Sequence, residues 1–430
     1  MTDSNSNNKV GVHLLRHDLR IKDNEALLSL CQQCQHVYLL YCHQNSWMEP
    51  NEFGHKHLGQ HRQIFVDEAL VDVAEKAQAA NIIPVFIKSE GIEDITKFVR
   101  LVDAGYLSYE LHFGFNEQQQ IAKVKASLPN LQFIEGQSNY LLNLNNLPFE
   151  MSDMPNVFSP FRRKIEKRLD VRMPSELAIE STTLQQPKAI DFSETFTLYE
   201  PSTKHSDNGY IGGENSAYKR LNDYFFDTDG IAVYKETRNG LDGWDFSSRL
   251  SAFLAHGCIS PAEIYRLLGE YETHRVKNDS TYWLFFELLW REFFHYQSNK
   301  HQAKLFAFGG IQEKPPLSQH NTEKFDSWVN GNTGYKIVDA CMKQLATTGF
   351  MSNRGRQLVA SCFVHELGLD WRWGASYFEQ ELIDFDVASN YGNWQYLAGV
   401  GSDPRGHRQF NLAKQTSTYD PQYKFINSWL

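Results

Sequence analysis

The first 135 residues alternate between short apolar runs and longer amphipathic stretches. The runs are rich in Val, Ile, Leu and Tyr and lie at 10–15, 36–42, 81–88 and 106–113. Helical periodicity fills the spaces between them, as in HRQIFVDEALVDVAEKAQAA. Strands that alternate with helices form parallel sheets with helices on both faces. The pattern predicts an α/β domain over 1–135, built on a doubly wound parallel sheet.

The remaining chain divides into an irregular segment and a helical one. Residues 136–210 contain six prolines and many Ser, Thr and Asn, which predicts a long surface connection between domains. From 211 onward strand-like runs disappear and helical patterns follow one another, as in STYWLFFELLWREFFHYQ and NRGRQLVASCFVHEL. We therefore expect an all-α domain over 211–430.

Composition narrows the class of protein. The 430 residues are 41% hydrophobic, and no run of 18 apolar residues or secretory leader pattern is visible. Six cysteines are scattered without framework spacing, which favours a reducing, cytoplasmic location. The net charge of −10 argues against a surface coated in positive charge, yet local basic clusters such as 161–168 could still contact phosphate.

No metal site is expected. Cys31 and Cys34 form a CxxC pair without a second ligand pair. The histidines at 55, 57 and 61 have metal-like spacing but no nearby carboxylate or thiol that completes a set, so we expect them at a solvated helix start.

One helical stripe in ELLWREFF carries chemistry. Glu287, Trp290, Arg291 and Phe294 are spaced i, i+3, i+4 and i+7, which places them on one face of a helix. A carboxylate, an indole and a guanidinium on one face suit a pocket that stacks a flat ring. An i,i+4 ion pair on a helix flank is the alternative.

Further polar residues gather in three short segments. Asn353 and Arg356 are one helical turn apart in MSNRGRQ, and Arg356 could pair with Asp384 of DFDVASN, since a buried carboxylate needs a partner. The SSRLS segment at 247–251 offers hydroxyls and backbone amides that suit a diphosphate or cap a helix. No strand–GxGxxG–helix is present, so a Rossmann nucleotide site has no support.

Six ordered segments carry a family resemblance over nearly the whole chain. They are HLLRHDLRIKDN, YKETRNGL, SSRLS with HGCISP, NDSTYWLFFELLWREFF, TGYKIVDACMKQLATTGFMSNRGRQLVAS, and SNYGNWQY with GSDPR and FNLAKQ. In this order they resemble the photolyase/cryptochrome family, and most closely its DASH-type branch.

The resemblance implies a light-driven flavoprotein with an N-terminal antenna domain and a C-terminal helical domain that binds FAD. The positions that match the family's flavin pocket are Tyr234, Ser247, Ser248, Ser251, Arg291, Asn353, Arg356, Asp384, Asp386 and Asn390. Among these, Asn390 matches the residue that faces flavin N5.

The resemblance also implies a DNA substrate. Glu287 and Trp290 match the family's lesion-facing pair, and Arg354 lies beside them. Tyr396 stands where many cyclobutane-dimer photolyases have tryptophan, which implies a weaker hold on a flipped dimer and a preference for single strands. The expected phosphate contacts are Arg354, Arg405, Arg408 and Lys414.

The family's electron-transfer chain and antenna site match only in part. Trp394 and Trp371 match the two inner tryptophans of the chain, but the outermost position falls at Ser318, which cannot carry a hole. Trp373, Tyr377 or another ring would have to substitute. Asn116, Glu117 and Lys314 lie near positions that hold a folate antenna, methenyltetrahydrofolate.

The sequence therefore predicts a monomeric DASH-type cryptochrome, without membrane association, that repairs cyclobutane pyrimidine dimers in single-stranded DNA. A signalling photoreceptor without repair activity and a divergent (6–4) photolyase are the alternatives. The (6–4) enzyme would be expected to offer histidines at the lesion, and FMSNRGR has none.

Overall fold

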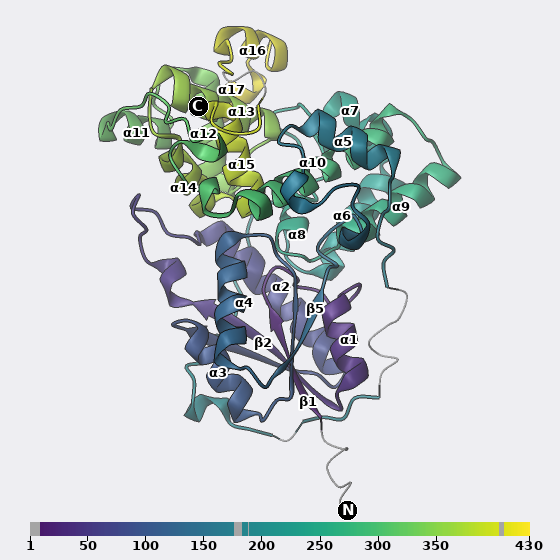
Figure 1. Cartoon of the computed structure of the whole chain (residues 1–430). Coiled ribbons are helices and arrows are strands. Elements are labelled where there is room, and N and C mark those ends of the chain that lie inside the picture. The colour runs from purple at the N-terminus through teal and green to yellow at the C-terminus, as the bar shows by residue number, and fades with distance from the viewer. Residues whose placement is uncertain (1–8, 176–182, 188, 404–407) are drawn as a thin grey trace, which may run out of the picture.

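A computed structural model describes residues 9–175, 183–187, 189–403 and 408–430. The N-terminal part is a five-stranded sheet of order β3-β2-β1-β4-β5, with every neighbouring pair parallel (Figure 1). Its strands are β1 (Val10–Leu15), β2 (His36–Gln44), β3 (Ile83–Ser89), β4 (Tyr106–Glu110) and β5 (Gln132–Gly136).

Helices cover both faces of this sheet. One apolar cluster joins the sheet to α1 (Glu25–Gln33) and α2 (Gln60–Ala79), and a separate cluster joins it to α3 (Ile92–Leu101) and α4 (Phe115–Ser127). Because the chain crosses from one face to the other between β3 and β4, the carboxyl ends of β1 and β4 adjoin at a topological switch point. The predicted doubly wound sheet is confirmed.

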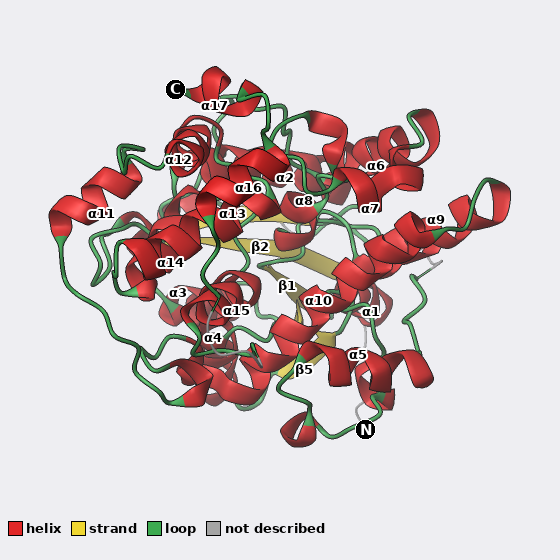
Figure 2. Ribbon diagram, turned by 90° about the horizontal axis from the view of Figure 1, so that it is seen from above, coloured by secondary structure: helices red, strands yellow, loops and turns green. Residues whose placement is uncertain are grey.

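The C-terminal part is helical and lies above the carboxyl ends of the strands, so that helices stand in front of the sheet in the view from above (Figure 2). Its α-helices are α6 (Glu214–Asn222), α7 (Tyr234–Thr237), α8 (Ser251–Ala255), α9 (Pro261–His274), α10 (Asp279–His301), α11 (Thr322–Val329), α12 (Lys336–Thr348), α13 (Asn353–Ser361), α14 (Trp371–Glu381), α15 (Val387–Ala398), α16 (Leu412–Tyr419) and α17 (Lys424–Trp429). In the described ranges, none of the helices has the length and apolar character needed to cross a membrane.

The long helix α10 lies at the centre of the helical part. Its start is fixed by a capping box, in which the Asn278 side chain accepts from the backbone of Thr281 and the Thr281 hydroxyl accepts from the backbone of Asn278. Over its length α10 packs against α7, α15 and α5 (Phe158–Lys167). The helix that carries ELLWREFF is therefore surrounded by other helices.

A buried arginine joins the sheet to the helical part. The Arg20 side chain is 1% exposed, and its guanidinium donates to the Gly257 carbonyl at 2.9 Å, to Asn139 Oδ1 at 3.1 Å and to Ser138 Oγ at 2.8 Å. Leu19 N–H also donates to the His256 carbonyl at 3.0 Å. The buried guanidinium is satisfied by loops from both parts, so the loop after β1 fixes how the two parts meet.

The structure differs from the sequence predictions in two places. The segment expected to be a surface connection contains α5, whose Phe158, Phe161 and Ile165 are buried, and that expectation was wrong in this respect. The histidines expected at a solvated helix start instead contact the helical part. His55 lies 3.0 Å from Ser376 Oγ and His57 lies 2.7 Å from Glu379 Oε1.

Gly257 gives a test of this joint. Its φ is +67°, and a Cβ there would lie 2.0 Å from the His17 carbonyl oxygen. We expect Gly257→Ala to destabilise the protein by about 2–4 kcal/mol, from left-handed backbone strain and overpacking. Chemical denaturation measures the change.

Gly269 in α9 supplies the matched control for this substitution. A Cβ at Gly269 meets nothing within 4 Å, and Gly269→Ala is expected to stabilise by up to about 1 kcal/mol. Equal stability of the two variants would contradict the packing described at the joint.

Candidate functional site

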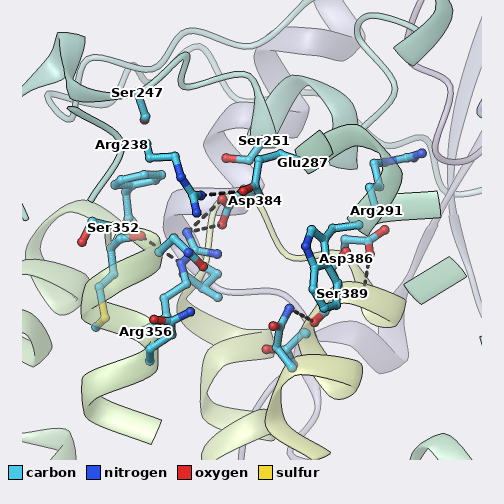
Figure 3. A pocket seen from close by; sticks show the side chains of 18 of the residues that line it. Arg238, Ser247, Ser251, Glu287, Arg291, Ser352, Arg356, Asp384, Asp386 and Ser389 are labelled. Atoms are coloured by element: carbon cyan, nitrogen blue, oxygen red, sulfur yellow. Dashed lines mark hydrogen bonds and ion pairs between the residues drawn. The ribbon is translucent and has the colours of Figure 1, made fainter. Parts of the chain in front are cut away.

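A cavity of about 570 Å³ opens in the helical part between α10, α13, α15 and the loop before α8 (Figure 3). Its volume lies in the range of cofactor sites. Every residue assigned to the flavin pocket lines it: Tyr234, Ser247, Ser248, Ser251, Arg291, Asn353, Arg356, Asp384, Asp386 and Asn390. The whole predicted stripe of Glu287, Trp290, Arg291 and Phe294 lines it as well.

The Arg356–Asp384 pair predicted from sequence is confirmed. Arg356 Nη2 donates to both carboxylate oxygens of Asp384 at 2.9 Å. The Asp384 side chain is only 2% exposed, so this charge depends on its partner. Figure 3 shows the two side chains directed at each other in the cavity. The pair places a charged, oriented donor against any ligand there.

Asp386 is held from two sides. Its carboxylate caps α15 by accepting the Ser389 N–H at 2.7 Å, and its Oδ2 lies 2.9 Å from Nε2 of the buried His295. Burial alone would raise the pKa of Asp386, but the nearby His295 and Arg291 charges bring this pKa well below its usual range. Asp386 therefore presents a fixed negative charge beside the cavity.

One turn into α15, an amide and an indole face the same space. Asn390 Nδ2 donates to the Ala375 carbonyl at 3.0 Å, which leaves the amide oxygen free to accept from a ligand. The ring of Trp394 lies against Gly374 of α14, where a Cβ would meet Trp394 Cη2 at 2.3 Å. This close approach requires glycine and brings Trp394 beside the helix that carries Trp371.

Three serines line the opposite wall. The hydroxyls of Ser247, Ser248 and Ser251 line the cavity and make no hydrogen bond with the described part of the chain. Arg249 lies between them with φ +58°, and its guanidinium donates to the Gly243 carbonyl at 2.8 Å and stacks over Phe350. Unpaired hydroxyls at a helix start fit an anionic group such as a diphosphate.

Glu287 is paired with an arginine that the sequence analysis did not single out. Arg238 Nη1 lies 2.6 Å from Glu287 Oε1, and Trp283 Nε1–H donates to the same oxygen at 3.1 Å. Burial raises the pKa of Glu287. Arg291 instead donates to the Asn139 carbonyl at 2.9 Å, so the alternative of a Glu287–Arg291 flank pair does not hold.

Aromatic rings form the rim near Glu287. Trp290 stacks on Phe158 of α5 with centroids 3.7 Å apart, and Tyr396 meets it edge-on at 6.2 Å. Arg408 lies over Tyr396 at 4.6 Å and is ion-paired with the buried Asp403. A flat, partly apolar surface thus adjoins the polar cavity.

The other expected DNA contacts lie outside the cavity lining. Arg354 donates to Gln357 and Asn239 and stacks over Tyr419. Lys414 is exposed on α16. Arg405 lies outside the described residues.

A second cavity of about 800 Å³ lies where the strands end. Asn116 and Glu117 line it, whereas Lys314 is exposed and is not among its lining residues. Burial would raise the pKa of Glu117, but hydrogen bonding and charge from His17 and His112 lower it to about 2. Cationic side chains from both parts of the molecule share this cavity: Arg16, Arg62, Lys123 and Arg372.

Two groups of potential metal ligands share His112. They are His17, His112 and Glu117, and His112, His295 and Asp386. His112 Nδ1 already accepts the Gly114 N–H at 3.1 Å, and its ring stacks on His17 at 4.3 Å. Stacked rings do not aim their lone pairs at one point, so the first group does not offer tetrahedral coordination. In the second group, Asp386 is already paired with His295 Nε2 at 2.9 Å.

Some residues of the cavity escaped the sequence analysis. Arg238 lies in the YKETRNGL segment that carried the family resemblance, but its partner Glu287 is far away in sequence. His295 is two turns from Glu287 on α10, and no local pattern links it to Asp386. Only long-range contacts reveal these pairs.

Comparisons with known proteins agree with this geometry. Residues 283–430 match the FAD binding domain of DNA photolyase, and residues 11–180 match the DNA photolyase domain. The unpaired serine hydroxyls, the oriented Arg356 and the fixed carboxylate of Asp386 fit such a cofactor.

Relatives cover nearly the whole chain. A cryptochrome DASH of Idiomarina loihiensis is 42% identical over 98% of this chain and 92% of its own length, and one of Vibrio parahaemolyticus is 40% identical over 98% and 93%. The crystal structure of a Synechocystis cryptochrome matches with a TM-score of 0.93 and 36% identity, over 99% of this chain and 89% of that one. With its fold, its flavin-binding cavity and these relatives, the chain belongs to the photolyase/cryptochrome family, in the branch of the DASH cryptochromes.

Proposed function

We propose that this protein is a light-driven enzyme that repairs cyclobutane pyrimidine dimers in single-stranded DNA. The observation that carries the proposal is that the lesion-facing pair and the flavin-pocket residues line one cavity. Bound, reduced FAD would supply the excited electron that splits the dimer and would take it back afterwards. The protein's part is to place the dimer and control charge.

In this proposal Glu287 and Trp290 receive the lesion. Trp290 is held flat by Phe158 and offers stacking area to a base. Arg238 fixes the Glu287 carboxyl in the cavity lining, where it can meet the polar edge of a bound base. Asn390 orients toward the flavin from α15.

The preference for single strands rests on Tyr396. A phenol offers less stacking area than an indole, and extrusion from a duplex costs a few kcal/mol. Arg408 and Arg354 already have protein partners, so phosphate must compete for them, and Lys414 is the freer of the cations. Such contacts weaken with salt.

The cavity lining bears on the two alternative functions, a (6–4) photolyase and a signalling photoreceptor without repair activity. Within the described residues, the cavity lining holds no histidine, which disfavours a (6–4) photolyase. A signalling photoreceptor would need the flavin pocket but not Glu287 and Trp290, and both face the cavity.

The second cavity is the proposed antenna site. A pterin carries amino and amide N–H groups, and the ionised Glu117 is a suitable acceptor for them. The arginines and lysine of the lining could hold the glutamate tail of methenyltetrahydrofolate. Lys314 is not part of this proposed antenna site, because it does not line the cavity.

We further propose a cytoplasmic monomer, with a domain boundary near residue 135 and a helical domain from 211. All six cysteines are free and buried, which fits a reducing compartment.

Flavin retention tests the pocket. Asp386→Asn keeps an N-cap for α15 but removes the charge, and we expect FAD to bind about tenfold more weakly or worse, since a hydrogen bond to a charged group contributes about 1.5–3 kcal/mol. The flavin absorbance of the protein after dialysis against known concentrations of FAD measures this affinity. Glu93→Ala, at an exposed position of α3, is the control, and equal losses in both variants would count against the site.

Repair assays test the function. Under blue light, with flavin chemically reduced beforehand, the protein should repair dimers in single-stranded oligonucleotides far better than in duplexes. Glu287→Ala should lower repair while FAD stays bound. Equal repair of both substrates would show that extruding the dimer from a duplex does not limit this protein, contrary to the role given to Tyr396. Repair of neither substrate would support the signalling alternative.

Two variants, Glu117→Ala and its control Lys314→Ala, test antenna binding. Glu117→Ala should abolish co-purification or reconstitution with methenyltetrahydrofolate, because the pterin loses its carboxylate partner, while FAD content stays unchanged. Lys314→Ala should keep the folate. The absorbance of bound folate measures both effects. Loss of folate in the Lys314 variant alone would place the antenna outside this cavity.

A further inference from the structure

The structure leaves light-driven flavin reduction without the expected terminal donor. Ser318 is exposed, and its neighbour Gln319 pairs with Gly368, just before α14, through a 2.8 Å hydrogen bond to its carbonyl. The segment thus runs beside Trp371, yet offers no ring at position 318. An electron for the flavin must come from another side chain.

The inner part of the route is in place. Trp394 of α15 lines the flavin cavity and packs on Gly374 of α14. Gly374 is one helical turn from Trp371 on α14. The ring of Trp371 lies 6.3 Å from that of Tyr391, at an interplanar angle of 79°. Its Nε1–H donates to the Phe308 carbonyl, a neutral acceptor, at 3.0 Å. Tyr391 is therefore the next oxidisable ring along this path.

Tyr391 has what a terminal donor needs. Its hydroxyl donates to Glu379 Oε2 at 2.9 Å, within the range for direct proton transfer. The other oxygen of Glu379 lies 2.7 Å from Nδ1 of His57, whose side chain is 41% exposed. Burial, followed by the Glu379 charge, raises the pKa of Tyr391 well above its usual range, so the phenol keeps its proton until it is oxidised. A path for that proton leads from Glu379 toward solvent.

We propose that Tyr391, with Glu379 as its proton acceptor, is the terminal electron donor for light-driven reduction of the flavin in this chain. The proposal rests on the flavin-binding part of the proposed function and not on repair. With excited, oxidised flavin bound, Trp394 would donate one electron to it, Trp371 would reduce Trp394, and Tyr391 would reduce Trp371. The Tyr391 O–H proton passes to Glu379 as the neutral tyrosyl radical forms; an external thiolate then gives one electron to the radical and becomes a thiyl radical, and Glu379 returns the proton to the Tyr391 oxygen. The net change is one electron gained by the flavin and one lost by the thiolate.

The competing exit has no comparable acceptor. Trp394 also approaches Trp328 at 6.2 Å, and Trp328 approaches Tyr377 at 5.6 Å. The Tyr377 hydroxyl, however, makes no hydrogen bond with the described residues. Beyond Trp328, Phe325 separates the path from Trp373, and a phenyl ring is hard to oxidise. A hole on this branch would return to the flavin before it could be trapped.

Transient absorption and electron paramagnetic resonance of the FAD-loaded protein test the proposal. After a blue flash without added reductant, the long-lived radical should have a tyrosyl spectrum. Tyr391→Phe should remove that spectrum, and reduction of the flavin by dithiothreitol under light should slow correspondingly. Glu379→Gln keeps the shape of the acceptor but not its basicity, and the yield of long-lived radical should fall by about 100-fold, the typical contribution of a positioned base.

Two variants on the other branch are the matched controls. Tyr377→Phe and Trp373→Phe should leave the tyrosyl spectrum and its lifetime unchanged. Bound FAD, measured in every variant, excludes a loss of cofactor as the cause. An unchanged radical in Tyr391→Phe, or its loss in Tyr377→Phe or Trp373→Phe, would overturn the proposal.

Repair separates this inference from the proposed function. With flavin reduced chemically in the dark, Tyr391→Phe should repair dimers at the wild-type rate, because the donor is then not needed. A wild-type protein that fails to repair but forms the Tyr391 radical would reject the proposed function and keep this inference.

Discussion

Two carboxylates, two residues apart at the start of α15, constrain the rest of the structure: Asp384 is buried, and the side chain of Asp386 is 10% exposed. Neither Asp384 nor Asp386 could stay charged without a partner, because an unpaired ion in a low-dielectric interior is costly. Arg356 from α13 supplies the first partner and His295 from α10 the second. These two pairs fix the relative positions of three helices. The space between the helices is the cavity that fits FAD, and its polarity is set before any ligand enters.

The helices α14 and α15, which border the flavin cavity, also contact the second cavity at the strand ends. Trp394 and Asn390 project from α15 toward the flavin site, whereas Tyr391 on the same helix faces the cavity at the strand ends. Glu379 of α14 and His57 of the sheet part meet there. One helix pair therefore adjoins the flavin cavity, the proposed antenna cavity and the proposed redox exit. The buried Arg20 holds the sheet part in place against them.

Local patterns predicted much of the fold, and long-range contacts explain what they missed. The runs that form β1 to β4 and the helical stripe of α10 were visible because apolar spacing reports burial directly. β5 escaped because it is a short edge strand with only Gly136 buried. α5 escaped because Pro160 and its basic residues suggest a loop, although proline is tolerated in a first helical turn. Arg356–Asp384 could be anticipated from the need of a buried acid, but Arg238–Glu287 and Tyr391–Glu379–His57 could not, since no local spacing links those segments.

The central claim is that one cavity holds the flavin and receives the lesion beside it. A crystal structure of the purified protein with a dimer-containing single-stranded oligonucleotide tests this most directly. The account predicts flavin density between Arg356, Asp386 and Trp394, with the dimer against Trp290 and Tyr396 in the same cavity. Flavin bound elsewhere, or a dimer held away from Trp290 and Glu287, would contradict it.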